Sequence, residues 1–237
     1  LQGHGHHRDG LALKRGQGHT SSPCPSRARC LVTAMSSLLP QRLLSVNTAP
    51  ATPIEIGGRR ILSGIGKRAV STPTDPQRIA VQRLGLAGDE QADLTVHGGL
   101  HKAVYAYPHE HYAFWQTVRA QAGMQAWDEA MPHGMMGENL TLTGLLEAQA
   151  YVGDQLRFAD CVLAISEPRR PCYKFDAIMG FKQATKMMAQ SGYCGFYLSV
   201  IQPGTIAAGE SYELIAGARE VSIKELFSAK MGRRHFD

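Results

Sequence analysis

From residue 43 onward, the chain repeats one pattern, in which short apolar or alternating segments are separated by glycine-containing turns. The clearest turn is Gly57-Gly58 inside Pro53–Leu62, because glycine accepts the positive φ angles of a two-residue hairpin. Further strands are predicted at Ile79–Leu86, Ala103–Tyr107, Leu140–Thr143, Gln155–Phe158, Val162–Ser166, Tyr197–Ile201 and Tyr212–Ile215. So many short strands predict a barrel or a sandwich.

A few helices interrupt the strands. One is predicted from Pro108, which the first helical turn tolerates, to Gly123, with apolar residues at helical spacing between them. A second is predicted from Asp176 as the N-cap to Gly192 as the C-cap, and a short third over 222–231. The fold class is therefore mainly β, in an α+β arrangement with peripheral helices.

Charge is distributed unevenly along the 237 residues, which carry a formal net charge of +5. Residues 1–34 hold five basic residues and one acidic residue, a net of +4, which leaves +1 for the rest. This tail has no apolar periodicity, so we expect it to be disordered, either as a transit peptide or as an extension ahead of Met35. Because the basic charge belongs mostly to the tail, we expect no nucleic-acid partner.

Neither a membrane nor a disulfide framework is indicated. No apolar run approaches the length needed to cross a bilayer, so no membrane partner is expected. The five cysteines are an odd number without a Cys-x-x-Cys pair, which argues against paired disulfides and a structural zinc site. A reducing compartment fits best, and we expect a cytoplasmic location.

The segment 166–175, Ser-Glu-Pro-Arg-Arg-Pro-Cys-Tyr-Lys-Phe, places one cysteine among basic residues and two prolines. The prolines favour extended backbone, and alternate side chains of an extended chain share a face. This alternation predicts Arg170, Cys172 and Lys174 on one face and Arg169 on the other. Nearby positive charge favours a thiolate, although a buried apolar cysteine in a plain basic loop is the alternative.

Two further clusters combine glycines with polar residues. Residues 85–99 contain Asp89, His97 and the pair Gly98-Gly99, whose backbone N–H groups can approach an anion or a ring. Residues 136–140 contain Glu138 and Asn139, which could grip the edge of a heterocycle. Ordinary turns and hydrogen-bonded strand ends remain alternative interpretations of both clusters.

Four motifs in order, at 88–99, 106–112, 137–141 and 167–174, resemble the MOSC domain, the C-terminal domain of molybdenum cofactor sulfurases. The resemblance is closest to the stand-alone bacterial YiiM-like branch. It implies a barrel-like MOSC domain over 35–220 and the start of a C-terminal helical segment at 221–237.

The resemblance also implies a binding site for the molybdenum–pterin cofactor, Mo-molybdopterin. Cys172 would be the protein ligand of the metal, which suits a soft thiolate. The implied cofactor-binding residues are Arg169, Arg170, Lys174, Gly98, Gly99, Glu138 and Asn139, and the implied catalytic residues are Cys172, Asp89 and His97.

Relatives of this kind are associated with reducing N-hydroxylated bases and related N-oxygenated compounds, so the resemblance implies a molybdenum-dependent oxidoreductase. The sequence contains no dinucleotide fingerprint and no iron–sulfur cysteine set, so a separate electron-donating reductase is expected as partner. Two alternatives stay open: a persulfide sulfur carrier that uses Cys172, and a non-catalytic module that binds or stores the cofactor. The oligomeric state, including a homodimer, is also open.

Overall fold

The computed structural model describes residues 39–92 and 98–232, which form a mainly β fold with a few helices. The predictions for the tail, residues 1–34, and for His97 lie outside the described residues. Within the described ranges, no helix has both the length and the apolar composition that a membrane crossing requires.

Eight strands form the largest sheet, in the order β13-β9-β10-β11-β7-β8-β1-β4. Their bounds are β1 Arg42–Thr48, β4 Arg68–Ser71, β7 Val104–Pro108, β8 Leu140–Thr143, β9 Gln155–Arg157, β10 Val162–Pro168, β11 Phe196–Gln202 and β13 Glu213–Ile215. All neighbours in this sheet are antiparallel except β7 and β8, which run parallel. The predicted strands between residues 103 and 215 are thus confirmed, whereas β1 and β4 were not anticipated.

The barrel part of the fold prediction is not confirmed. In the part of the chain that the structure describes, no ladder joins the end strands β13 and β4. β4 pairs only with the last residues of β1, Val46–Thr48. The beginning of β1 instead bonds to the chain before β13, where Gly209 N–H donates to the Leu43 carbonyl at 2.7 Å and Leu43 N–H to the Glu210 carbonyl at 2.9 Å. The sheet therefore curls towards closure through loop contacts rather than through a strand pair.

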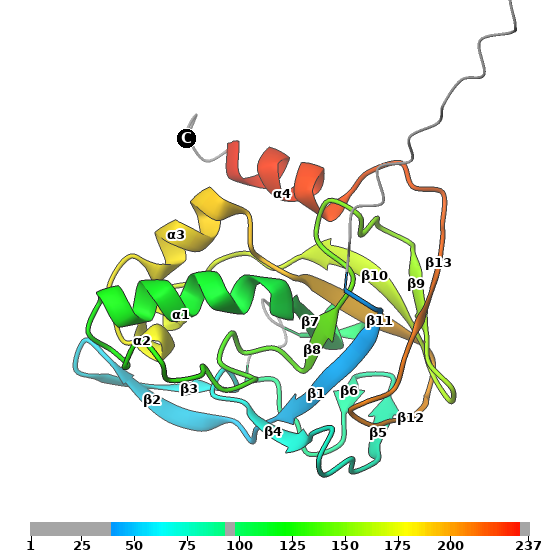
Figure 1. The fold of residues 1–237 in the computed structure, drawn as a ribbon, viewed down its shortest axis with the longest axis horizontal. Coiled ribbons are helices and arrows are strands. Elements are labelled where there is room, and N and C mark those ends of the chain that lie inside the picture. The colour runs from blue at the N-terminus through cyan, green and yellow to red at the C-terminus, as the bar shows by residue number, and fades with distance from the viewer. Residues whose placement is uncertain (1–38, 93–97, 233–237) are drawn as a thin grey trace, which may run out of the picture. The chain divides into compact units, whose positions relative to one another are not determined.

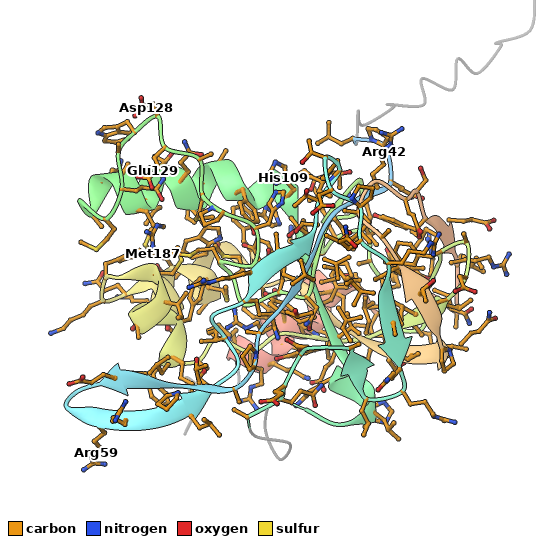
Figure 2. All side chains as sticks on the ribbon, turned by 90° about the horizontal axis from the view of Figure 1, so that it is seen from below. Arg42, Arg59, His109, Asp128, Glu129 and Met187 are labelled. Carbon is orange, nitrogen blue, oxygen red and sulfur yellow. The ribbon has the colours of Figure 1, made fainter. Side chains whose placement is uncertain are left out.

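Two smaller sheets complete the β structure. β12 (Gly204–Ile206), β5 (Ile79–Gln82) and β6 (Gly85–Leu86) form one of them, and the hairpin of β2 (Thr52–Ile56) and β3 (Arg59–Ser63) forms the other. The predicted glycine turn is confirmed, with φ of 57° at Gly57 and 74° at Gly58. Figure 2 shows Arg59 near the outer end of this hairpin, pointing away from it.

The helices agree with the sequence except at one break. α1 (Tyr112–Gln121) follows a 3₁₀ turn at His109–His111, and α4 (Ile223–Gly232) is also present. The predicted helix from Asp176 to Gly192 is divided into α2 (Lys174–Met179) and α3 (Ala184–Ser191), because Gly180 ends α2 in a left-handed conformation with φ of 81°. Asp176 lies inside α2, and its carboxylate accepts the Thr185 N–H at 2.7 Å, at the start of α3.

The helices α1, α2 and α3 lie on the same side as the β2–β3 hairpin (Figures 1 and 2). Trp115 of α1 is fully buried, and its Nε1–H donates to the Tyr107 hydroxyl of β7 at 2.6 Å. Its ring also meets Phe175 of α2 edge to face, with the centroids 5.3 Å apart. One aromatic contact set thus links β7 to α2, the helix that begins two residues after Cys172.

The close packing of this core can be tested by a substitution at Gly195, just before β11. Its φ is 62°, and a Cβ atom there would lie 2.5 Å from the Ala106 carbonyl oxygen. Gly195→Ala should therefore lower the free energy of unfolding by about 2 kcal/mol or more, through backbone strain and overpacking. Urea denaturation measures this difference. Gly66→Ala is the matched control, because its Cβ would meet no atom within 4 Å, and an equal loss in both variants would contradict the packing argument.

Candidate functional site

A pocket opens between the base of the β2–β3 hairpin, the loop after β6 and the segment after β10. Its lining residues come from distant parts of the sequence: Ser63, Gly64, Ile65, Lys67, Asp89, Glu90, Gln91, Ala92, Lys102, Tyr105, Gly137, Asn139, Arg169, Cys172, Lys174 and Tyr197. Five of the predicted site residues meet here, namely Asp89, Asn139, Arg169, Cys172 and Lys174. Four basic side chains face two acidic ones, so the pocket is basic overall.

Cys172 is a free, half-buried cysteine at this pocket. Its backbone is fixed by its own carbonyl, which accepts the Thr185 hydroxyl at 3.0 Å and the Phe175 N–H at 2.9 Å. Cys161 and Cys194 are buried elsewhere in the core, at 1% and 0% exposure. Of the described cysteines, Cys172 is thus the one whose thiol borders open space.

The predicted alternation of side chains after β10 is wrong. Arg169 is buried and lines the pocket beside Cys172, whereas Arg170 is exposed and lies outside the lining. The reason is local: β10 ends at Pro168, before either arginine. The two residues after it are not extended strand, so the two-residue period no longer applies.

Arg169 carries a buried charge that no carboxylate of the described residues neutralises. Its side chain is 4% exposed, and within residues 39–92 and 98–232 no carboxylate forms an ion pair with it. The guanidinium lies over the rings of Tyr105 and Phe175, 5.1 and 5.2 Å from their centroids. Burial raises the pKa of Tyr105 and of the nearby Tyr197, so both phenols stay neutral near pH 7. A buried cation in neutral surroundings favours an anionic ligand.

Lys174 connects the Cys172 segment to the hairpin. Its ammonium donates to the Leu62 carbonyl at 3.2 Å, at the end of β3. The next residues, Ser63 and Gly64, line the pocket, and a Cβ on Gly64 would lie 2.3 Å from the Glu90 carbonyl oxygen. Glycine is therefore required at position 64, where the chain approaches the Glu90 backbone closely.

Asp89 and Lys67 form an ion pair in the pocket wall, with side-chain exposures of 4% and 8%. The Asp89 carboxylate also accepts the Ala49 N–H at 3.0 Å and the Asn139 amide at 2.9 Å. Burial lowers the pKa of Lys67, an effect that the charge of Asp89 opposes. Asp89 is thus the acceptor that holds a buried ammonium at the edge of the pocket.

Glu138 and Asn139, which are adjacent in sequence, have different environments. Asn139 lines the pocket, but Glu138 is fully buried and lies outside the lining. The Glu138 carboxylate accepts bonds from the Gly134 and Met136 N–H groups at 2.8 and 3.0 Å, and from two hydroxyl groups. Burial raises its pKa. In this structure, Glu138 therefore supports the loop before β8 and the start of β8, and it does not line the pocket.

The glycine pair after the 93–97 segment is set back from the pocket. Gly98 and Gly99 are half-buried and do not line it. The Gly99 N–H instead donates to Gln91 Oε1 at 3.1 Å, while Gln91 Nε2 donates to the Leu84 carbonyl at 3.0 Å. Gln91, which lines the pocket, thus ties together the two ends of the segment that contains His97.

Four important lining residues were missed from sequence: Lys67, Lys102, Tyr105 and Tyr197. Lys67 follows Gly64-Ile-Gly66, and a lysine after paired glycines was a usable signal. The two tyrosines lie in predicted strands, but which face of a strand borders a pocket is decided by tertiary packing. No local pattern distinguishes Lys102 from an ordinary surface lysine.

The assignment of Glu138 as a structural residue can be tested by Glu138→Gln. The amide nitrogen cannot accept the N–H bonds of the loop, so the variant should lose at least about 1–3 kcal/mol of unfolding free energy. Urea denaturation gives this value, with Glu110→Gln as the control. Full stability of Glu138→Gln would contradict the structural assignment.

Comparison with known proteins shows which family the chain resembles. Residues 93–213, just over half of the chain, match the family model of the MOSC domain. YflK of Bacillus subtilis, described as uncharacterized, is 34% identical over 77% of this chain and 77% of its own. YiiM of Escherichia coli is 35% identical over 62% of this chain and 63% of its own, less than two thirds of that protein.

A solved structure agrees with these matches. The crystal structure of YiiM from Geobacillus stearothermophilus has a TM-score of 0.62 at 28% identity, and the match covers 82% of this chain and 86% of that one. A protein of Gibberella moniliformis named a reductase is 30% identical over 74% of this chain, but only 29% of that protein is matched. The chain therefore belongs to the MOSC domain family, in its YiiM-like branch.

Proposed function

We propose that the pocket binds the molybdenum–pterin cofactor, with the thiolate of Cys172 as the protein ligand of the metal. The observation that carries this proposal is the juxtaposition, in one pocket, of a half-buried free thiol with the buried guanidinium of Arg169, which forms no ion pair with a carboxylate of residues 39–92 or 98–232. Thiolates suit soft metal centres, and guanidinium groups suit phosphate. The residues present therefore fit a cofactor that offers both a metal and a phosphate.

In this proposal, only two of the three basic residues next to Cys172 bind the cofactor. Arg169 and Lys174 lie on either side of Cys172 in sequence and line the same pocket, so they would bind the anionic part of the cofactor. The exposed Arg170 takes no part. Asn139 presents an amide to the pocket, and Asp89 acts as a positioning residue, because it already accepts three bonds from its neighbours. His97 stays a predicted catalytic residue.

We further propose that the reaction is the reduction of an N-hydroxylated base, in which the N–O bond breaks and the oxygen leaves as water. Two electrons and two protons are needed: R–NHOH + 2e⁻ + 2H⁺ → R–NH₂ + H₂O. The bound cofactor would supply a two-electron redox centre. A separate reductase in the cytoplasm would provide the electrons. The fungal reductase supports this idea, because its matched region is only part of a longer protein.

The metal assignment is tested by replacing Cys172 in a host that synthesises the cofactor. We expect molybdenum in the purified wild type and at least a tenfold loss in Cys172→Ser, measured by elemental analysis. Cys161→Ala, a change at a buried cysteine outside the pocket, should retain the metal. Equal molybdenum in wild type and Cys172→Ser would refute the proposal.

Assays on protein purified from this host also distinguish the proposed reductase from the two alternative functions, a storage module and a persulfide carrier. Turnover of an N-hydroxylated base with a reduced electron donor supports the reductase. Bound molybdenum without any turnover would indicate a storage module. Cyanide-labile sulfur on Cys172 without metal would indicate a persulfide carrier.

The adjacent Arg169 and Arg170 allow a matched test of whether Arg169 binds the phosphate of the cofactor. Arg169→Gln should reduce the pterin bound per protein by about tenfold or more, because charged hydrogen bonds to phosphate are worth roughly 1.5–3 kcal/mol. Arg170→Gln should bind as the wild type does. Pterin fluorescence after oxidative release measures both. Equal losses in the two variants would contradict the assignment of Arg169.

A further inference from the structure

Lys67 borders two hollows of the surface. It lines the pocket described above, and it also lines a second groove between β4, the loop before β8 and α2, to which Arg68, Pro132 and Ile178 contribute. In the part of the chain that the structure describes, no other residue lines both. Arg68 and Pro132 are exposed, so the groove is open to solvent. Lys67 therefore still borders solvent when a ligand fills the pocket.

The backbone of Lys67 is fixed by the turn that precedes β8. A Cβ atom on Gly134, which has φ of 88°, would lie 2.7 Å from the Lys67 carbonyl oxygen, and one on Gly137 would lie 2.7 Å from Ile65 Cγ1. The Lys67 N–H donates to the Ile65 carbonyl at 2.9 Å. Two glycines thus let the segment before β4 pack closely on this turn. Lys67 enters the pocket wall from a well-defined position.

The ammonium of Lys67 is buried against a carboxylate that is itself fixed. It donates to Asp89, and the two side chains are 8% and 4% exposed. Asp89 also accepts the Ala49 N–H at 3.0 Å and the Asn139 amide at 2.9 Å, so it cannot follow a moving lysine. The ammonium therefore keeps one place in the wall of the pocket.

This environment makes Lys67 a stronger acid than an ordinary lysine. Burial lowers its pKa below the usual 10.5, although the charges of Asp89 and Glu138 oppose the shift. On the groove side, Arg68 is a permanent cation, and burial lowers the pKa of His133 to about 4, so its ring is neutral near pH 7. A buried ammonium with a lowered pKa releases its proton more readily.

Several other donors in the pocket are less suited to releasing a proton. The guanidinium of Arg169 keeps its proton at any pH of interest. Burial raises the pKa of Tyr105 and of Tyr197, which makes both phenols weaker acids. Lys174 donates to the Leu62 carbonyl and belongs to the anion-binding side of the proposed function. The reduction proposed above consumes two protons, so the pocket needs a donor.

We infer that Lys67 is the catalytic residue that donates a proton to the oxygen of the N–O bond, while Asp89 positions its ammonium. The electron pair of that bond stays with the oxygen, which takes the Lys67 proton and leaves as water. The nitrogen takes two electrons from the reductase and one proton from solvent. The neutral amine of Lys67 then regains a proton from solvent. This inference rests on the proposed function.

The first test is Lys67→Arg in full-length, molybdenum-loaded protein, with hydroxylaminopurine as substrate and reduced methyl viologen as electron donor. Arginine keeps the positive charge beside Asp89 but does not release its proton. The kcat should therefore fall by about a hundredfold or more, the usual contribution of a general acid, while KM and molybdenum content stay unchanged. Lys186→Arg is the matched control, because Lys186 is an exposed lysine of α3, and its kcat should not change.

Chemical rescue and the pH profile separate proton donation from a structural role. Lys67→Ala should be as slow as Lys67→Arg, and added ethylamine should restore part of its rate. In the wild type, the protonated amine is the active form, so kcat should fall as pH rises through the lowered pKa of Lys67, at a pH below 10.5. The residual rate of Lys67→Arg should lack this fall.

A further measurement needs no cofactor. The unfolding free energy of the cofactor-free wild type is compared with that of Lys67→Arg by urea denaturation at several pH values. Unfolded Lys67 binds its proton more tightly than folded Lys67 does, so stability gains as folded Lys67 loses its proton. The wild-type value minus the Lys67→Arg value should therefore increase as pH rises towards 10.5.

The outcomes distinguish this inference from the proposed function. A loaded wild type without turnover would refute the proposed reductase and, with it, the inference. Turnover by the wild type together with an undiminished kcat in Lys67→Arg would overturn the inference alone. A stability difference that does not change with pH would also overturn it, because the folded Lys67 would then be no stronger an acid than an exposed lysine.

Discussion

Asn139 makes the set of hydrogen bonds on which the rest of the site depends. Its N–H and side-chain oxygen both bond to the backbone of Tyr105, at 2.8 and 3.0 Å. Its carbonyl and side-chain amide bond to the backbone of Asn47, at 2.7 and 3.2 Å. The same amide reaches Asp89, which in turn holds Lys67. One residue thus joins β7 and β1 at the start of β8, where a parallel pair adjoins an antiparallel one, and connects this junction to the pocket.

The pocket owes its positive potential to a buried charge that no carboxylate of the described residues neutralises. The fold places Arg169 against aromatic rings and away from described carboxylates, whereas it pairs the less buried Lys67 with Asp89. A paired ammonium contributes little net potential, but a guanidinium that no carboxylate of the described residues neutralises contributes much more of its charge. The positive end of the pocket is therefore the Cys172 side, and ligands that carry a negative group should orient accordingly.

The sequence predicted the strands well because glycine turns and apolar alternation are local signals. Motifs in the sequence also singled out Cys172, Asp89 and Asn139, which line one pocket in the structure; their roles stay predictions. Prediction from sequence failed where tertiary structure decides: β10 ends at Pro168, so the two-residue alternation expected of Arg169 and Arg170 does not hold. The curl of the sheet depends on loop contacts of β1, which no local period encodes.

The fixed backbone of Cys172 bears on the order in which the protein is assembled. The bonds that hold its carbonyl come from Thr185 and Phe175, so they are made by the chain itself. The thiol is therefore presented in its final setting as soon as α2 and α3 have folded. Under the proposed function, folding of this segment would therefore not require the cofactor, and loading would follow folding as a separate step.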